Sequence, residues 1–208
     1  KAGKTPKEFT DEVSQRFRDL VNTGKNLLNV SNDDFIRTTD ERHRKPAQEI
    51  WKRMEKNGHI YLDKYAGWYS VRDEAYYQES ELVAGKAPTG ADVEWVEEES
   101  YFFDLSKWQE PLLKLYKENP QFITPQSRYN EVVSFVEGGL RDLSISRTTF
   151  NWGIHVPGND KHVIYVWVDA LTNYLTVVGW PDEDSEDYGK FWEKQSDISP
   201  MHVVGKDI

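Results

Sequence analysis

The first third of the chain carries apolar residues at helical spacing, separated by polar stretches. Thr5, Pro6 and Glu8 predict a helix start, with Thr5 as the N-cap, Pro6 at the first helical position and Glu8 completing a capping box. The apolar residues that follow recur every three or four positions: Phe9, Val13, Phe17, Leu20 and Val21. We therefore expect an amphipathic helix that ends near residues 22–24.

A second helix is predicted over residues 45–56, because its apolar stripe has the same spacing and Asn57-Gly58 follows as a stop signal. The stripe consists of Ala47, Ile50, Trp51 and Met54. Between the two helices, residues 34–37 predict a short strand, followed by a polar turn that contains Thr38, Asp40 and His43.

The middle of the chain changes character and predicts a small α+β region. Residues 59–77 contain short aromatic runs broken by Gly67 and by Arg72-Asp73-Glu74, which predicts β-hairpins. A further strand pair is expected around residues 93–96 and 101–104. Two helices should follow, and their expected ranges and inward apolar residues are 106–119 (Trp108, Leu112, Leu115, Tyr116) and 127–138 (Val132, Phe135, Val136).

The last quarter returns to a β-α-β pattern. Residues 162–170 form a β-branched run with little alternation, which is typical of a parallel strand buried on both faces. A helix over 171–178, a short helix with Phe191 and Trp192, and a last strand over 201–204 complete the prediction. Both ends of the chain thus predict an α/β fold, and the middle predicts an insert.

Composition excludes several classes of protein. The 208 residues have 38% hydrophobic and 30% charged content, no cysteine and a formal net charge of −10. The charge argues against a strongly nucleic-acid-binding surface, although a large RNA-binding enzyme can keep its RNA contacts in another domain. Disulfides and Cys-ligated zinc are excluded. No apolar run approaches the ~20 residues that span a bilayer, no signal peptide is evident, and the cytoplasm is the default expectation.

No complete catalytic motif follows from the residues alone. The five histidines lack metal-ligand spacing, and Glu97-Glu98-Glu99 is expected to be a solvated face. Two strand ends are candidate sites, because open α/β sheets bind ligands there. At the first, Trp167 and Asp169 would share a strand face near Ala170 and Tyr174, with a plain core and a helix cap as the equal alternative. At the second, residues 205–207 could bind a nucleotide or simply form a turn.

The order of several short motifs provides the stronger signal. The string YVWVDALTNY resembles the methionine-pocket motif of methionyl-tRNA synthetases, which are class I enzymes, and the final GKDI resembles a strand end of that family. Further resemblances occur in family order at residues 38–43, 65–77, 100–108, 142–147 and 152–157. Together they cover nearly the whole chain.

The resemblance implies a Rossmann-type parallel sheet interrupted by a connective-peptide insert, with segments 1–58, 59–143 and 144–208 as first half, insert and second half. It implies that the methionine side chain is bound by Val166, Trp167, Ala170, Leu171, Tyr174 and Ile208. Gly205 and Asp207 would contact adenosine, and Arg147 and Asp169 would support the active site. The implied reaction uses ATP with Mg²⁺ to activate L-methionine and transfers it to tRNA(Met), with no membrane partner.

The sequence also departs from the family pattern. The phosphate-binding signatures His-Ile-Gly-His and Lys-Met-Ser-Lys-Ser are absent, so we expect an excerpt of a longer chain that is inactive by itself. The cysteines of the zinc knuckle found in many relatives are absent too, and no zinc is expected in this segment. Two alternatives stay open: another class I synthetase, such as the leucine or valine enzyme, and a non-catalytic binding module related to synthetases.

Overall fold

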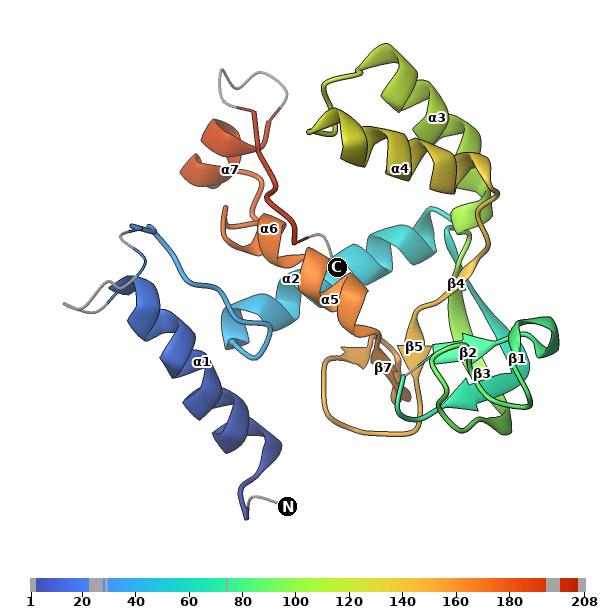
Figure 1. The fold of residues 1–208 in the computed structure, drawn as a ribbon. Coiled ribbons are helices and arrows are strands. Elements are labelled where there is room, and N and C mark those ends of the chain that lie inside the picture. The colour runs from blue at the N-terminus through green and yellow to red at the C-terminus, as the bar shows by residue number, and fades with distance from the viewer. Residues whose placement is uncertain (1–2, 23–27, 29, 74, 194–198, 206–208) are drawn as a thin grey trace. The chain divides into compact units, whose positions relative to one another are not determined.

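The computed structural model describes residues 3–22, 28, 30–73, 75–193 and 199–205 (Figure 1). The chain divides into two compact units, which we call unit 1 (Lys1–Lys52 with Asn151–Ile208) and unit 2 (Arg53–Phe150). The elements that begin in unit 1 are α1 (Pro6–Asn22), α2 (Glu41–Lys56), β6 (His155–Val156), β7 (Asn159–Ile164), α5 (Val166–Leu171), α6 (Asn173–Thr176) and α7 (Glu186–Phe191). Those of unit 2 are β1 (Ile60–Ser70), β2 (Ala75–Tyr77), the 3₁₀ helix η1 (Glu79–Glu81), β3 (Glu94–Phe103), the 3₁₀ helix η2 (Leu105–Trp108), α3 (Gln109–Glu118), α4 (Gln126–Glu137), β4 (Leu143–Ser144) and β5 (Ser146–Arg147).

The predicted capping box at the start of α1 is confirmed. The N–H of Thr5 donates to Glu8 Oε2 at 2.8 Å, and the N–H of Glu8 donates to Thr5 Oγ1 at 3.3 Å. The carboxylate of Glu8 accepts from the Thr5 backbone N–H and also from the Thr5 hydroxyl at 2.9 Å, and these two bonds, the backbone one first, hold the pKa of Glu8 below its ordinary value. Arg37 Nη1 contacts Asp11 Oδ1 at 2.7 Å, which connects α1 to the segment before α2.

Helix α2 begins at Glu41, four residues before its predicted start. His43, Ala47 and Trp51 are each 0% exposed and lie four residues apart, so they form one buried stripe. The prediction missed the first turn because a histidine occupies the position where the stripe begins. His43 is therefore a helical core residue and not part of a polar turn.

The short strand predicted over residues 34–37 is wrong, since these residues form no ladder in the described chain. A local hydrogen bond competes with strand pairing there: Asp34 Oδ1 accepts from the N–H of Phe35 at 2.6 Å. The segment instead lines a polar cavity, described below.

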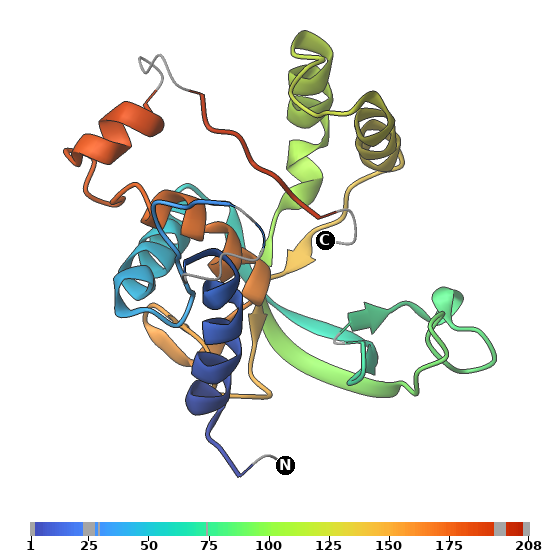
Figure 2. The same cartoon turned by 60° about the vertical axis from the view of Figure 1, so that its left-hand side comes forward.

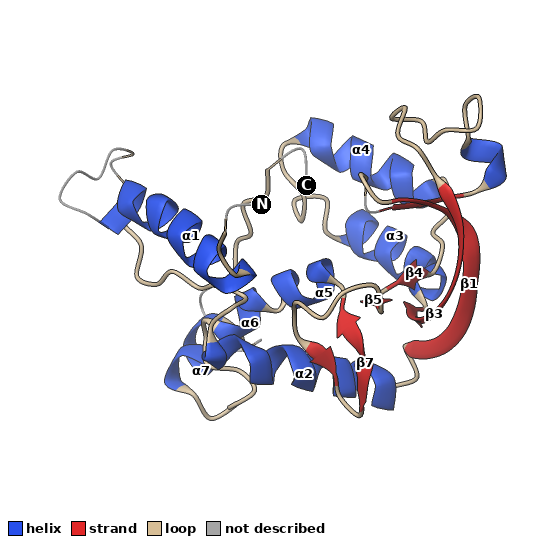
Figure 3. Ribbon diagram, turned by 90° about the horizontal axis from the view of Figure 1, so that it is seen from below, coloured by secondary structure: helices blue, strands red, loops and turns tan. Residues whose placement is uncertain are grey.

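The run over residues 162–170 differs most from its prediction. Strand β7 ends at Ile164, and it pairs antiparallel with β6. The antiparallel pairing follows from the two-residue turn Pro157-Gly158, which connects the paired residues Val156 and Asn159. Glycine suits the second position of this turn because Gly158 has φ 79°. The remainder of the run is helical. Figure 3 shows β7 followed closely by α5.

Unit 2 contains the antiparallel sheet β2-β1-β3-β4. The hairpin predicted at Arg72-Asp73-Glu74 is confirmed as β1–β2, but the break predicted at Gly67 is wrong, because β1 runs through that residue. Figures 2 and 3 show β1 beside β3 as a long curved ribbon. The predicted strand pair around 93–96 and 101–104 is wrong, because β3 continues through the acidic run. Alternation explains this continuity: Glu97 and Glu99 are exposed, whereas Glu98 is half-buried and accepts a hydrogen bond from the Tyr76 hydroxyl at 2.9 Å.

The predicted helix pair of unit 2 is also present. The 3₁₀ helix η2 leads into α3, and α4 begins and ends within one residue of its expected bounds. Tyr116 and Val136 are buried as expected. Phe135 is not, since it is 71% exposed, so its inward placement was wrong.

Candidate functional site

The candidate site lies on two short helices of unit 1, α5 and α6. Their buried face is polar: Asp169, Thr172 and Thr176 are 8%, 4% and 6% exposed. These positions are three and four residues apart, so they fall on one side of a continuous helical path. Thr172 Oγ1 donates back to the Val168 carbonyl at 2.8 Å, and Thr176 Oγ1 approaches the Thr172 carbonyl at 3.1 Å.

The imidazole of His43 contacts this polar face from α2. Nε2 lies 2.7 Å from Asp169 Oδ1 and 3.0 Å from the Asp169 carbonyl oxygen, and Nδ1 lies 2.9 Å from Thr176 Oγ1. A carbonyl oxygen only accepts hydrogen bonds, so Nε2 carries a proton. The buried carboxylate of Asp169 therefore has a hydrogen-bond donor, as a buried charge requires.

The side of α5 opposite Asp169 is apolar and exposed. Trp167 and Leu171 on that side are 44% and 57% exposed, and Val166, the first residue of the helix, is 54% exposed. Trp167 and Leu171 are four residues apart and share a helix face, whereas Asp169 lies two residues from each and points the other way. The expectation that Trp167 and Asp169 share a strand face was wrong, because the segment is a helix. Trp167 is exposed within this chain, and its assignment to a methionine pocket or to a core stays a prediction.

Tyr174 of α6 is half-buried and is stacked on the ring of His202, with centroids 4.1 Å apart and planes 23° apart. The ring of Trp192 lies beside the same imidazole, with the two ring centroids 6.0 Å apart and the planes tilted by 32°. No local pattern predicted this aromatic cluster, because His202 is one of five histidines without metal-ligand spacing.

The second predicted strand end is only partly described. Residues 201–204 form no strand, contrary to prediction, and Met201 and Val203 are 87% and 89% exposed. Gly205 is exposed. Asp207 and Ile208 lie outside the described residues, so their expected contacts with adenosine and methionine stay predictions.

Arg147 belongs to unit 2 and is 7% exposed. Its Nη1 donates to Ser144 Oγ at 2.8 Å and to the Ser146 carbonyl at 2.8 Å. The guanidinium also lies 6.0 Å from the centroid of the Tyr76 ring. Burial, and next the hydrogen bond to Glu98, raise the pKa of the Tyr76 hydroxyl. The structure thus places Arg147 in a polar cluster of its own unit, and its expected support of the active site stays a prediction.

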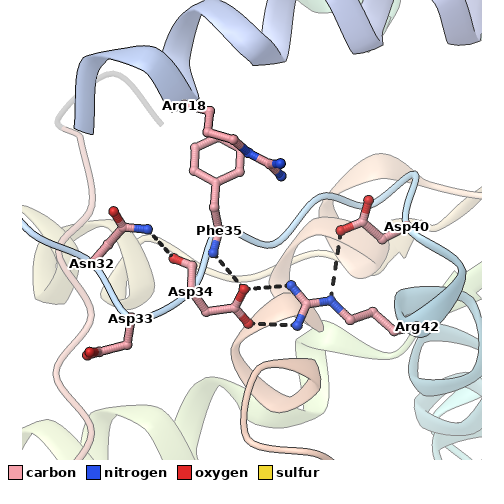
Figure 4. A pocket seen from close by; sticks show the side chains of 7 residues that line it. All are labelled: Arg18, Asn32, Asp33, Asp34, Phe35, Asp40 and Arg42. Atoms are coloured by element: carbon pink, nitrogen blue, oxygen red, sulfur yellow. Dashed lines mark hydrogen bonds and ion pairs between the residues drawn. The ribbon is translucent and has the colours of Figure 1, made fainter. Parts of the chain in front are cut away.

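A separate cavity of about 290 Å³ lies before α2 and is lined by polar side chains (Figure 4). Arg42 binds both oxygens of Asp34 at 2.7 Å, and its Nε lies 3.8 Å from Asp40. The hydrogen bond to Arg42 lowers the pKa of Asp34. Arg18 lies over the Phe35 ring at 5.0 Å. With little apolar lining, this cavity does not fit the side chain of an apolar amino acid.

Two kinds of feature are absent from the described residues. Among the described residues, no three histidine, aspartate or glutamate side chains gather where they could hold a metal ion. No helix in the described ranges is both long and apolar enough to cross a bilayer.

Known proteins match the chain from end to end. A family model described as tRNA synthetases class I (M) matches residues 1–94 and 89–208. The methionine–tRNA ligase of Rickettsia bellii (strain RML369-C) is 59% identical over 204 residues, which cover 98% of this chain and 38% of that relative. The methionine–tRNA ligase of Brucella suis biovar 1 (strain 1330) is 55% identical over 213 residues, which cover 100% of this chain and 39% of that relative. The chain therefore spans about two-fifths of these relatives.

Solved structures agree with the sequence matches. The Mycobacterium tuberculosis methionyl-tRNA synthetase bound by methionyl-adenylate superposes with a TM-score of 0.80 at 50% identity, covering 91% of this chain and 39% of that one. Its apo form gives a TM-score of 0.72 at 49% identity, with coverages of 89% and 38%. The mixed α/β fold expected from the sequence is thus confirmed. Every strand pairing described within either unit is antiparallel, so the expected parallel sheet is not seen in this part. Since the family model matches both ends and the middle, the chain belongs to the class I tRNA synthetases (M).

Proposed function

We propose that this chain is the part of a methionyl-tRNA synthetase that presents the methionine side-chain pocket. The observation that carries the proposal is the exposed apolar side of α5 formed by Trp167 and Leu171, with the exposed Val166 at the start of the helix. An apolar, partly aromatic surface suits methionine, whose thioether is a weak acceptor on a flexible apolar chain. Ala170, Tyr174 and Ile208 complete the proposed pocket, following the family motif in this sequence.

The proposed reaction of the full-length enzyme has two steps. A carboxylate oxygen of L-methionine attacks the α-phosphorus of ATP, a new O–P bond forms, and the bond to the leaving pyrophosphate breaks. A terminal ribose hydroxyl of tRNA(Met) then attacks the carbonyl carbon of methionyl-adenylate and AMP leaves. Such chemistry depends mainly on positioning and on stabilising developing charge.

Individual roles follow the same proposal. Gly205 and Asp207 contact the adenosine of ATP, and Arg147 supports the active site from the segment after the insert. Asp169 orders the pocket from beneath, consistent with its buried contact to His43. Unit 2 corresponds to the connective insert. The described residues offer no group of ligands that fits Mg²⁺, so no step is assigned to that ion.

The first alternative, a different class I synthetase, is disfavoured by the insert of about 59–143, which is too small for the editing insert of the leucine and valine enzymes. The second alternative is a non-catalytic module. It would be excluded if the flanking sequence of the parent chain contained both phosphate-binding signatures. The cytoplasm stays the expected location.

The test is amino-acid selectivity of the full-length enzyme in pyrophosphate exchange. An apolar pocket recognises shape, and one methylene is worth only about 1–3 kcal/mol there. Norleucine keeps the length of methionine and should be activated appreciably, whereas leucine branches early and should be far poorer. We expect kcat/KM to fall in the order methionine, norleucine, leucine, with the larger gap between the last two. Leucine, isoleucine or valine as the best substrate would overturn the proposed function.

A further inference from the structure

The orientation of α5 and α6 depends on contacts from outside these helices. α5 has six residues and α6 has four. Isolated helices shorter than about 12–15 residues are marginal in water, so tertiary contacts must hold such short pieces in place. The contact on their buried face comes from His43, which is 126 positions from Asp169 in the chain and is 0% exposed.

One imidazole contacts both short helices. Nε2 donates to the side chain and the main chain of Asp169 in α5, at 2.7 and 3.0 Å. Nδ1 lies 2.9 Å from Thr176 Oγ1 in α6. The ring is fixed in turn, because His43 lies on the same buried stripe of α2 as Ala47 and Trp51. The longer helix α2 thus stabilises α5 and α6, which are too short to be stable without tertiary contacts.

The contact determines which face of α5 is presented outward. Asp169 and Trp167 are two residues apart and lie on opposite sides of the helix. Fixing the Asp169 carboxylate against His43 therefore turns Trp167 and Leu171 toward the outside, where they are 44% and 57% exposed. A rotation of α5 would move both sides together, because they belong to one helical turn.

We propose that His43 is a positioning residue for the methionine pocket, acting through Asp169 to set the rotation of α5. The inference rests on the proposed function, since it assigns a role in binding methionine. His43 does not touch the substrate in this proposal. Its effect reaches methionine only through the helix that carries Trp167.

Two substitutions in the full-length enzyme distinguish the contact made by His43 Nδ1 from the contacts made by His43 Nε2. His43→Asn can place an amide nitrogen near the Nδ1 position and loses the contact to Asp169. His43→Gln can place an amide nitrogen near the Nε2 position and retains a donor for Asp169. We expect His43→Asn to raise the KM for methionine about tenfold, as small misplacements of binding groups do, with the KM for ATP unchanged. His43→Gln should recover most of this loss. His155→Asn is the matched control, because the half-buried ring of His155 bonds only the Asp160 carbonyl at 2.9 Å among the contacts described.

Melting temperatures distinguish positioning from general destabilisation. Both His43 variants alter the same buried site and should melt at similar, lowered temperatures, so stability cannot account for a difference in methionine KM. Equal methionine KM in His43→Asn, His43→Gln and the wild type would overturn the inference. So would a proportional rise in the KM for methionine and for ATP in both variants.

A second substitution keeps the inference testable if His43→Asn does not fold. Asp169→Ala removes the carboxylate, favours the helix, and leaves Nε2 its main-chain acceptor. It should raise the KM for methionine in the same direction, and an unchanged KM would overturn the inference. A wild-type enzyme that fails to activate methionine would instead overturn the proposed function, and the two failures are therefore distinguishable.

Discussion

Replacing Trp167 with alanine should weaken methionine binding more than folding. A tryptophan or phenylalanine truncated in a packed core costs about 3–5 kcal/mol of folding free energy. Trp167 is 44% exposed, so little more than half of its surface is buried to begin with. Scaled by that fraction, the expected folding cost is about 2 kcal/mol. The lost contact with methionine should appear as a higher KM for methionine, because the indole would otherwise cover the bound side chain.

The measurement compares melting temperature and methionine KM in the full-length enzyme. Trp95→Ala is the matched control, because Trp95 is 53% exposed on β3 of unit 2 and has no place in the proposed pocket. Trp95→Ala should lower the melting temperature about as much as Trp167→Ala and leave the methionine KM nearly unchanged. If Trp167→Ala also left the methionine KM unchanged, Trp167 would be structural and the pocket reasoning would be refuted.

Three further predictions concern other parts of the chain. Thr5→Ala should destabilise the first turn of α1 by about 1 kcal/mol, seen as faster amide hydrogen exchange there, whereas Thr10→Ala in the same helix should not. The hydrogen bond to Asp142 raises the pKa of Tyr61 from 10.0 to about 12, so the unfolded chain deprotonates first and stability should fall as pH rises from 10 to 12. Tyr61→Phe should flatten that decline in melting temperature, and a slope equal to that of the wild type would contradict the assignment. The isolated 208-residue chain should show no methionine-dependent pyrophosphate exchange, because both phosphate-binding signatures are absent from it.

Sequence patterns predicted the elements whose stability depends on nearby residues. The capping box of Thr5 and Glu8 was readable because its partners are three residues apart. The hairpin β1–β2 and the helix α4 were readable for the same reason, since turn residues and apolar spacing lie within each segment. Strand β3 was predicted as two strands, and the three consecutive glutamates within it were predicted to be a solvated face, whereas Glu98 is half-buried.

The site itself was mispredicted because a β-branched run does not distinguish a buried strand from a helix. The sequence does carry one helical signal in this segment. Asp169, Thr172 and Thr176 recur at spacings of three and four, which is a polar helical stripe in the segment predicted as strand and helix. The contact of that stripe with His43 could not be read from one sequence, because the partners are 126 positions apart and share no motif.

The polarity of α5 is the reverse of an ordinary surface helix. Such a helix buries its apolar stripe and exposes its charges. α5 instead buries Asp169 and exposes Val166, Trp167 and Leu171. Covering an apolar side chain of this size completely is worth about 1.5–3 kcal/mol, so three side chains that are each about half exposed forgo about 2–4 kcal/mol of stabilisation. The buried carboxylate adds a desolvation cost unless it is hydrogen-bonded. The desolvation cost is offset by the hydrogen bond from His43 to the Asp169 carboxylate, and the cost of the exposed apolar side chains is offset when an apolar ligand covers them. Within this chain, the reversed polarity of α5 therefore fits a helix that is held from beneath by His43 and whose outer residues are covered by another group, which the proposed function assigns to methionine.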